Sequence, residues 1–478
     1  MPEFGNWIGG DWLAGQSTRP NINPSDLTDT IGDFAQADAK DARRAIASAR
    51  EARSAWAMAS VQSRADALEC IARELLGRSD ALGTMLAREE GKTRAEGIAE
   101  VMRAGAIFRF FAGEAVRHLG EYLPSVRPGV EIEVTREPVG VVGLITPWNF
   151  PIAIPAWKIA PALAWGNCVV FKPAELVPAS AWALADVISR AGLPPGVFNL
   201  VCGPGREVGQ TILGDPRIDA VSFTGSVATG RKVIEACAVR GVRAQVEMGG
   251  KNPLLVLDDA DLDVAVRCAV QGAYFSTGQR CTASSRFIVT RGIYARFVRE
   301  LQEAVSTLRV GHALAGDTQI GPVVDASQLV VDMNYVEIGR AEGAKLVCGG
   351  EALQRDTEGY FFSPALFVDA DASMRIAREE IFGPVACAIV ADDYEHALTL
   401  ANDSEFGLTA GICTTSLKYA THFKRNVEAG MAMVNVPTAG VDYHVPFGGR
   451  KASSYGPREQ GRNAVEFYTT LKTAYTAA

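Results

Sequence analysis

The chain lacks the features that mark exported, membrane-bound and nucleic-acid-binding proteins. Basic residues are not in excess: 47 Lys and Arg stand against 55 Asp and Glu, which gives a formal net charge of −8. Because a duplex-binding surface needs a basic face, the charge argues against nucleic acid as a partner. The N-terminal run MPEFGNWIGGDWLAG has neither a basic nor an apolar segment. We therefore expect no signal peptide and a cytoplasmic protein.

Only one uncharged run, residues 138–157, is long enough to span a bilayer. Pro147, Pro151 and Pro155 interrupt it. A membrane helix broken in this way would leave backbone groups without partners in lipid. The run therefore predicts a buried strand, a turn and a helix, and we expect no membrane association.

The nine cysteines form no C-x-x-C pair and are widely spaced. This pattern argues against a zinc site and a disulfide framework, and it is typical of free thiols in a reducing compartment. Most such thiols are small core residues, so each needs further evidence before it is assigned chemistry. We expect no metal site.

At 478 residues, the chain is too long for one hydrophobic core, so we expect more than one packed unit. Residues 41–118 have helical periodicity. Beyond them, short apolar runs alternate with helical stretches, which predicts βαβ units and a parallel sheet. A second such series after residue 250 predicts a second α/β domain. The predicted strands of the first series are 140–146, 167–172, 196–201 and 219–224, and those of the second are 253–258, 286–290, 386–390 and 410–415.

Two segments fit neither series. Residues 129–138 alternate apolar and polar side chains like an exposed strand, and the C-terminal run EFYTTLKTAYTA is rich in β-formers. Neither has an evident partner in its own domain. Because exposed strand edges must be covered, we expect these segments to pair with another subunit.

The strongest chemical signal is FSTGQRCTASSR, residues 275–286. Gly278 permits a tight turn before Cys281, and polar residues follow, whereas most other cysteines lie in apolar runs. This setting favours a nucleophilic thiolate. The alternative is a buried structural cysteine. No histidine is near in sequence, so a Cys–His pair would have to be formed by the fold.

Polar side chains also follow the ends of predicted strands, where α/β enzymes place catalytic groups. Glu247 ends one strand before two glycines, and Asn149 follows another, where an amide can serve an oxyanion hole. A solvated carboxylate and a turn-forming asparagine are the alternatives. Lys172 and Glu175 follow a third strand and can bind ribose hydroxyls. Ser226 opens a helix in a phosphate-binding arrangement, although no G-x-G-x-x-G motif is present.

Taken together, PWNFP, FKPAE, FTGS, EMGGKNP, GQRC, EEIFGPV and PFGGRK resemble the motifs of the aldehyde dehydrogenase superfamily, in that family's order, from about residue 140 to residue 450. The resemblance implies an α/β fold with a Rossmann-like cofactor domain, an α/β catalytic domain and a small β bridging and oligomerisation region. The implied boundaries are 1–118 and 139–249 for the NAD(P)-binding domain, 250–448 for the catalytic domain, and 119–138 and 449–478 for the bridging region.

The resemblance also implies roles for individual residues. Cys281 is the nucleophile that carries a thioester, Glu247 is the general base, and Asn149 with the Cys281 backbone N–H forms the oxyanion hole. The implied cofactor is NAD or NADP. Glu175 should repel a 2′-phosphate, whereas Lys172 can offset it, so the choice stays open. The implied cofactor-binding residues are Ile145, Thr146, Trp148, Lys172, Glu175, Gly205, Phe223, Gly225, Ser226, Met248, Gly249, Glu380 and Phe382.

The run 440–461 resembles the branch of the family that oxidises semialdehydes, with 2,5-dioxopentanoate (2-oxoglutarate semialdehyde) as the expected substrate. Succinate semialdehyde or a broad aldehyde range is the alternative, and a non-catalytic protein on the same fold is the alternative of another class. An anionic substrate needs a cation in an apolar tunnel, so we expect Arg103 to bind its carboxylate, with Arg109 and Arg280 as the other candidates. We also expect a homodimer or homotetramer. The implied substrate-site residues are Arg103, Phe150, Ile154, Trp157, Phe275, Arg280 and Phe447.

Overall fold

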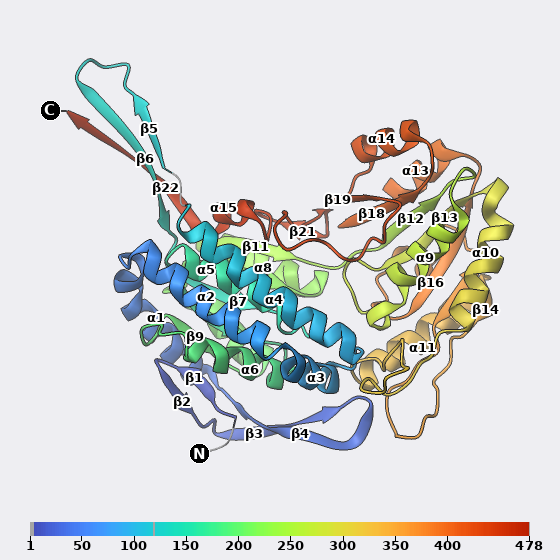
Figure 1. Ribbon diagram of the computed structural model, residues 1–478, viewed down its shortest axis with the longest axis horizontal. Coiled ribbons are helices and arrows are strands. Elements are labelled where there is room, and N and C mark those ends of the chain that lie inside the picture. The colour runs from blue at the N-terminus through green and yellow to red at the C-terminus, as the bar shows by residue number, and fades with distance from the viewer. Residues whose placement is uncertain (1–3, 118–119, 478) are drawn as a thin grey trace.

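Two large sheets covered by helices form the body of the chain in the computed structural model, which describes residues 4–117 and 120–477 (Figure 1). A narrow three-stranded sheet projects from the first of these α/β units and carries the C-terminus. The N-terminal half of the chain and most of the glycine-rich motifs belong to the first unit. Residues from about 250 to 440 build the second.

The first sheet has eight strands, and its five central strands are parallel. Their chain order across the sheet is 3-2-1-4-5, the order of a dinucleotide-binding sheet, which reverses between β7 and β10. Ligands bind such sheets at the carboxyl ends of the strands beside that reversal. The four strands predicted here are confirmed. In spatial order the strands are β2 (Asp11–Leu13), β1 (Asn6–Ile8), β9 (Phe198–Leu200), β8 (Cys168–Lys172), β7 (Val141–Ile145), β10 (Ala220–Thr224), β11 (Arg243–Glu247) and β21 (Ser454–Tyr455).

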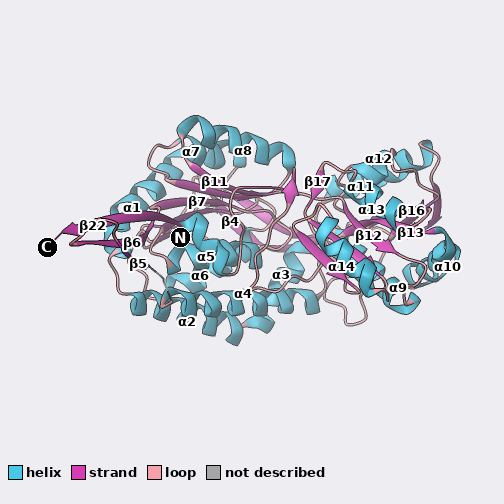
Figure 2. Ribbon diagram, turned by 90° about the horizontal axis from the view of Figure 1, so that it is seen from above, coloured by secondary structure: helices cyan, strands magenta, loops and turns pink. Residues whose placement is uncertain are grey.

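Helices cover both faces of this sheet: α7 and α8 lie on one face, and α5 and α6 lie on the other, with α2 and α4 outside them (Figure 2). The helices predicted over residues 41–118 are confirmed. The run REVGQTILG is helical but begins as a π-helix, η1 (Gly205–Gly209), before α7. The helices of this unit are α1 (Ala39–Ala57), α2 (Val61–Gly77), α3 (Ser79–Glu90), α4 (Arg94–Ala115), α5 (Ala153–Ala164), α6 (Pro178–Ser189), α7 (Gln210–Gly214) and α8 (Val227–Arg240).

The second sheet has seven strands, all parallel except β14 at one edge. The four strands predicted after residue 250 are confirmed as β12, β13, β16 and β18. The strands in spatial order are β14 (Lys345–Cys348), β15 (Ala365–Val368), β16 (Val385–Ala391), β13 (Ser284–Thr290), β12 (Asn252–Val256), β18 (Thr409–Cys413) and β19 (Met431–Val434). The helices are α9 (Leu262–Ala273), α10 (Arg291–Ser306), α11 (Ala326–Ala341), α12 (Arg375–Arg378), α13 (Tyr394–Asn402) and α14 (Leu417–Asn426).

The projecting sheet corrects one expectation. Its strands are β5 (Glu121–Pro124), β6 (Val130–Pro138) and β22 (Thr469–Ala477). The two segments thought to lack a partner pair with each other, antiparallel, from Thr469 opposite Pro138 to Ala477 opposite Val130. The first part of EFYTTLKTAYTA is a short helix, α15 (Val465–Tyr468), because its aromatic residues pack on the first core. The proposed boundary between residues 118 and 119 lies outside the described residues.

An N-terminal hairpin ties the two units together. Its strands are β3 (Ser17–Asn23) and β4 (Asp26–Gln36), and it runs along the lower edge of the first unit toward the second (Figure 1). The backbone N–H of Leu27 donates to the Glu358 carbonyl at 2.9 Å. Residues 138–157 contain β7 and the start of α5, as expected. Among the helices of the described residues, none is long and apolar enough to cross a membrane.

Candidate active site

A cavity of about 550 Å³ lies where the two units meet, and Cys281 lines it. Its walls come from α4, from the segment that joins β7 to α5, from the turn before β13, and from residues 440–447. Apolar side chains dominate the walls. Of the residues expected in a substrate tunnel, Phe275 packs instead against the core of the second unit. The others line the cavity: Arg103, Phe150, Ile154, Trp157, Arg280 and Phe447.

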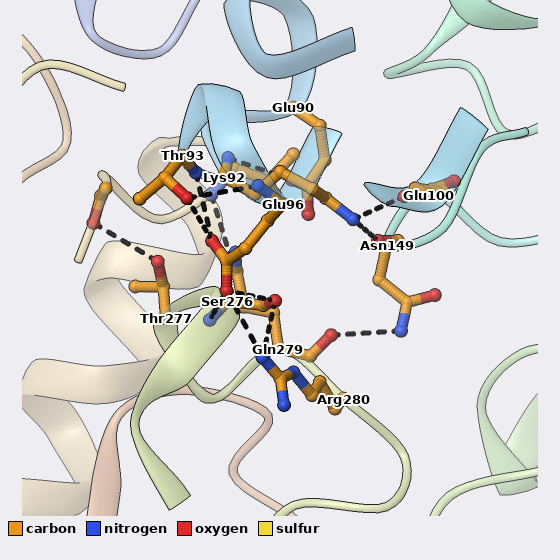
Figure 3. A network of polar contacts seen from close by, with 12 residues as sticks. Glu90, Lys92, Thr93, Glu96, Glu100, Asn149, Ser276, Thr277, Gln279 and Arg280 are labelled. Atoms are coloured by element: carbon orange, nitrogen blue, oxygen red, sulfur yellow. Dashed lines mark hydrogen bonds and ion pairs between the residues drawn. The ribbon is translucent and has the colours of Figure 1, made fainter. Parts of the chain in front are cut away.

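The turn before Cys281 has an unusual backbone. Ser276, Thr277 and Gly278 all have positive φ angles, of 51°, 56° and 67°. Such angles are costly for residues with a Cβ, above all for β-branched threonine, so the turn depends on its surroundings. A Cβ on Gly278 would also overlap the Gly383 carbonyl, so this position requires glycine. The turn is held from α4, where Glu96 accepts hydrogen bonds from the Ser276 N–H and Oγ at 2.8 and 2.9 Å (Figure 3).

Cys281 is half-buried, and its carbonyl accepts a hydrogen bond from Asn252 Nδ2 at 2.7 Å. Burial, together with the nearby carboxylates of Glu380 and Glu247, raises the pKa of the Cys281 thiol to about 12. The thiol is therefore protonated at neutral pH in this arrangement. Its chemistry as a nucleophile requires a base to take the proton.

Glu247 ends β11 with its side chain buried. Ser454 Oγ donates a hydrogen bond to one carboxylate oxygen. Burial raises the pKa of Glu247 well above its usual value, and the nearby Glu459 carboxylate adds to this. A carboxyl group whose pKa moves toward neutrality is suited to general base catalysis.

Lys158 and Glu459 form a buried ion pair next to Glu247, and Lys158 also donates to Ser222 Oγ at 2.7 Å. The sequence analysis assigned neither residue a role. The available signal was Lys158 itself, a single charge within α5, whose twelve residues are otherwise uncharged and all buried. Charged groups are almost never fully buried unless they are paired.

Asn149 lies in the segment between β7 and α5, buried beside the turn of Cys281. One hydrogen of its Nδ2 group donates to the Gln279 carbonyl at 2.9 Å, which leaves the second for another acceptor. Its backbone carbonyl accepts from Lys92 Nζ at 2.7 Å (Figure 3). Asn149 is therefore held once through its side chain and once through its backbone.

A buried charge cluster stands behind this segment. Lys92 Nζ lies 2.7 Å from Glu100 and 3.8 Å from Glu90, and all three side chains are almost fully buried. Glu100 also accepts the backbone N–H groups of Ile152 and Ala153 at the start of α5, at 2.9 and 3.1 Å. The cluster thus holds the segment at Asn149 itself and at its junction with α5. The sequence analysis did not identify these charges.

The residues expected to bind a cofactor gather at the carboxyl ends of β7, β8 and β10. Ile145 ends β7, and Phe223 is the next-to-last residue of β10. Two buried hydroxyls at these ends, Thr146 Oγ1 and Thr224 Oγ1, have no hydrogen-bond partner among the described residues. They lie beside the reversal of strand order, where a ligand could satisfy them.

The N-terminus of α8 opens directly after β10. Ser226 caps the helix by accepting the Thr229 N–H, and a Cβ on Gly225 would come within 2.6 Å of the Phe223 ring. Position 225 therefore has to be glycine, and a residue without a side chain leaves its backbone open to close approach by a ligand. A helix N-terminus with free N–H groups favours an anion such as a pyrophosphate.

Lys172 and Glu175 follow β8, the strand whose end carries the ribose-binding acid in sheets of this order. Glu175 Oε1 accepts the Gly205 N–H at 3.0 Å, and Lys172 Nζ lies 3.8 Å from the position that a Cβ on Gly205 would take. The second oxygen of Glu175 pairs with Arg19 Nη1 at 3.2 Å. Arg19 belongs to the N-terminal hairpin and was not identified from the sequence.

The second unit contributes residues that face this sheet. Glu380 accepts the Gly250 N–H at 3.0 Å and packs closely on Gly249, and burial raises the pKa of Glu380 to about 7. The rings of Trp148 and Phe382 meet edge to face, with centroids 5.4 Å apart. Met248 is buried behind them. The expected cofactor residues of the two units thus meet across the space between the units.

The chain matches the sequence pattern of the Aldehyde dehydrogenase family over residues 12–474. It is 42% identical to the alpha-ketoglutaric semialdehyde dehydrogenase of Bacillus subtilis (strain 168) over 474 residues, which cover 98% of this chain and 97% of that protein. It is 40% identical to the 2,5-dioxopentanoate dehydrogenase of Saccharolobus solfataricus over 468 residues, which cover 97% of each chain.

Solved structures resemble the whole chain. Betaine aldehyde dehydrogenase from Staphylococcus aureus in complex with NAD+ superposes with a TM-score of 0.97 at 34% identity, covering 100% of this chain and 95% of that one. An NADP dependent enzyme from E. coli superposes with a TM-score of 0.96 at 35% identity, covering 100% and 98%.

Proposed function

The chain belongs to the aldehyde dehydrogenase family, and we propose that it oxidises 2,5-dioxopentanoate, the semialdehyde of 2-oxoglutarate, to 2-oxoglutarate. It is an NAD(P)-dependent aldehyde dehydrogenase of the aldehyde dehydrogenase fold. The observation that carries the substrate proposal is a cavity that holds both a cysteine and an arginine, Cys281 and Arg103. Relatives that act on this semialdehyde support it.

Arg103 is suited to bind the remote carboxylate of the substrate. Its guanidinium lies 5.9 Å from the Trp157 ring. Among the residues that the structure describes, it donates only to a neutral amide, that of Gln460, at 3.2 Å, and its buried Nε has no hydrogen-bond partner. Arg280 lines the same cavity, but its charge is balanced by Glu96 at 3.2 Å. The guanidinium of Arg103 therefore has the greater capacity for a new anion.

The residues of the first sheet fit a bound NAD(P). The unpartnered hydroxyls of Thr146 and Thr224, the closely approachable Gly225 and the acid Glu175 occupy the positions at which such sheets bind a dinucleotide. When bound, the nicotinamide supplies the acceptor for the hydride that leaves the substrate carbon. The implied set in full is Ile145, Thr146, Trp148, Lys172, Glu175, Gly205, Phe223, Gly225, Ser226, Met248, Gly249, Glu380 and Phe382.

Cys281, Asn149 and Glu247 carry the chemical steps of the proposal. The Cys281 thiol gives its proton to water as its Sγ attacks the aldehyde carbon, and the oxyanion that forms is held by the free hydrogen of Asn149 Nδ2 and by the Cys281 N–H. After hydride loss a thioester remains on Cys281. Glu247 takes a proton from water, which attacks the thioester and releases the acid and the thiol. The raised pKa of Glu247 supports its role as base.

We further propose that two α/β domains, divided at residue 249, are joined by a bridging region at residues 119–138 and 449–478. The two separate large sheets support this division, although β21 pairs with β11 of the first sheet. We also propose a cytoplasmic homodimer or homotetramer. All nine cysteines are free, which supports a reducing compartment, and the exposed projecting sheet offers a surface for a second subunit.

The test is a steady-state comparison of kcat/KM for 2,5-dioxopentanoate, succinate semialdehyde and pentanal, each with NAD and with NADP. The proposal expects 2,5-dioxopentanoate to give the highest value. A higher kcat/KM for succinate semialdehyde would contradict 2,5-dioxopentanoate as the substrate but would still support a site for an anionic aldehyde. A higher value for pentanal would overturn the role of the arginine as well.

A further inference from the structure

We propose that Arg19 binds the 2′-phosphate of NADP and so allows this chain to accept NADP as well as NAD. The inference rests on the proposed function, because it assumes that the adenosine ribose binds at Glu175. It adds to that function a residue from outside the dinucleotide-binding sheet, since Arg19 belongs to the hairpin of β3 and β4.

The hairpin is anchored beside the ribose site. Asn21 Nδ2, two residues from Arg19, donates to the Leu176 carbonyl at 3.1 Å, directly after Glu175. The Arg19 guanidinium lies 3.2 Å from Glu175 Oε2, while the other Glu175 oxygen accepts the Gly205 N–H. The backbone thus brings a cation from the N-terminal arm to the acid that would meet the ribose.

Charge alone explains why this pair matters for cofactor choice. In sheets of this order an acid at this position binds the ribose hydroxyls of NAD and repels the 2′-phosphate of NADP. Arg19 neutralises that acid in the free protein. Both side chains are partly exposed, at 49% for Arg19 and 35% for Glu175, and exposed ion pairs hold their partners weakly. Little is lost when the guanidinium turns from carboxylate to phosphate.

A guanidinium suits the phosphate better than the other cation at the site. Arginine binds phosphate through two parallel hydrogen bonds and stays charged at any physiological pH. Lys172 is buried, and burial lowers its pKa. Lys172, at the end of β8, is therefore better suited to contact the ribose than a phosphate at the protein surface beside the hairpin.

The first experiment measures binding of two cofactor fragments by isothermal titration calorimetry: adenosine 2′,5′-bisphosphate and 5′-AMP. Arg19→Ala should weaken the bisphosphate about tenfold, the loss of one charge-assisted hydrogen-bonded contact, and change 5′-AMP by less than about twofold. The matched control is Arg109→Ala. Arg109 pairs with Glu69 at 3.1 Å with side-chain exposures of 53% and 38%, close to those of the Arg19 pair, but on α4. This control should change neither ligand.

A second series separates direct contact from neutralisation of Glu175. In a Glu175→Gln background, Arg19→Ala should still weaken the bisphosphate about tenfold, because the phosphate contact remains to be lost. Disappearance of the effect would overturn direct binding.

Three further results would also overturn the inference. The first is equal weakening of both fragments by Arg19→Ala, which would assign Arg19 to holding the hairpin. The second is no effect of Arg19→Ala on either fragment. The third is that Arg206→Ala, which changes the exposed neighbour of Gly205, weakens binding of the bisphosphate about tenfold while Arg19→Ala leaves it unchanged. If wild type binds neither fragment, the ribose site of the proposed function fails first.

Discussion

At the scale of single residues, the surroundings of the site raise the proton affinity of two of its acidic groups. Burial raises the pKa of both Cys281 and Glu247. The thiol therefore cannot ionise by itself at neutral pH, and the carboxyl group is a stronger base than an exposed glutamate. Glu247 is therefore suited to take a proton from the attacking water and to return it to the departing Cys281 sulfur.

Cys281→Ala should abolish dehydrogenase activity while binding of 5′-AMP is unchanged. The substitution removes the attacking atom but leaves the residues at the ends of β7, β8 and β10 intact. Cys70→Ala, which changes another half-buried cysteine, on α2, is the control and should keep full activity. Substantial turnover by Cys281→Ala would contradict the proposed mechanism.

Glu247→Gln should slow hydrolysis of the thioester by about 10²–10⁴-fold while a first burst of NAD(P)H survives. Rapid mixing with aldehyde measures both phases. The wild-type steady-state rate should rise with pH through the raised pKa of Glu247, because only the deprotonated carboxylate accepts the proton. That rise should be absent from the variant. Loss of the burst with an unchanged steady-state rate would assign Glu247 a different role.

Arg103→Ala should reduce kcat/KM for 2,5-dioxopentanoate by an amount equivalent to about 2–5 kcal/mol, the cost of removing one partner of a buried charge pair. For pentanal, which has no carboxylate, little should change. Arg103→Lys keeps the charge but not the two parallel donors, so it should recover part of the loss. Equal losses for both substrates would make Arg103 structural, and Tyr443 and His444 would be tested next.

At the scale of elements, α4 connects the nucleophile turn to the oxyanion segment. Its first turns supply Glu96 to the turn of Ser276 and Glu100 to the start of α5. Thr93 caps the helix in a capping box with Glu96, so one carboxylate serves both the helix end and the turn. The strained backbone before Cys281 is thus held by an element that lies nearly 180 residues earlier in the chain.

Lys92→Met should lower stability by about 3–5 kcal/mol, because it leaves the buried Glu100 carboxylate without its cation. The midpoint of urea denaturation measures this. Lys472→Met is the control: it breaks an exposed pair with Glu137, of 59% and 43% side-chain exposure, and should cost less than about 1 kcal/mol.

Addition of Glu100→Gln to Lys92→Met should recover part of the lost stability, since the unpaired charge is then gone. The single Lys92→Met variant should also show a decrease in kcat that is larger than its change in KM, because the Asn149 backbone carbonyl loses the hydrogen bond from Lys92. A stability change no larger than that of the control would show that the cluster is not a paired charge site.

The elements also show where sequence patterns sufficed. Periodicity located eight strands of the two large sheets and the helical stretch over residues 41–118, since their apolar residues repeat along the chain. It did not show that residues 129–138 pair with the C-terminal strand, because strand pairing between distant segments leaves no local signal. Nor did it assign structure to the stretch with β3 and β4, whose apolar and polar residues alternate weakly and few of whose residues are buried.

At the scale of the whole molecule, the projecting sheet is exposed to an extent unusual for three strands. Eight of the nine residues of β22 are exposed. Strand edges and faces of this kind are commonly covered by another copy of the chain. Deletion of residues 469–478 should give monomers or insoluble protein, measured by light scattering against the full chain. An unchanged assembly would contradict the proposed role of this sheet in oligomerisation.

The sequence by itself determined the two α/β units, the free thiols and the membership of the family, because apolar periodicity, cysteine spacing and the order of short motifs are all written along the chain. The same local patterns indicated Cys281, Glu247 and Asn149 as candidates. Only the tertiary structure decided which charges stand behind them. Lys92, Glu100 and Arg19 meet their partners through contacts of distant segments, and the free energy of a buried or shared charge depends on that three-dimensional surrounding rather than on its neighbours in sequence.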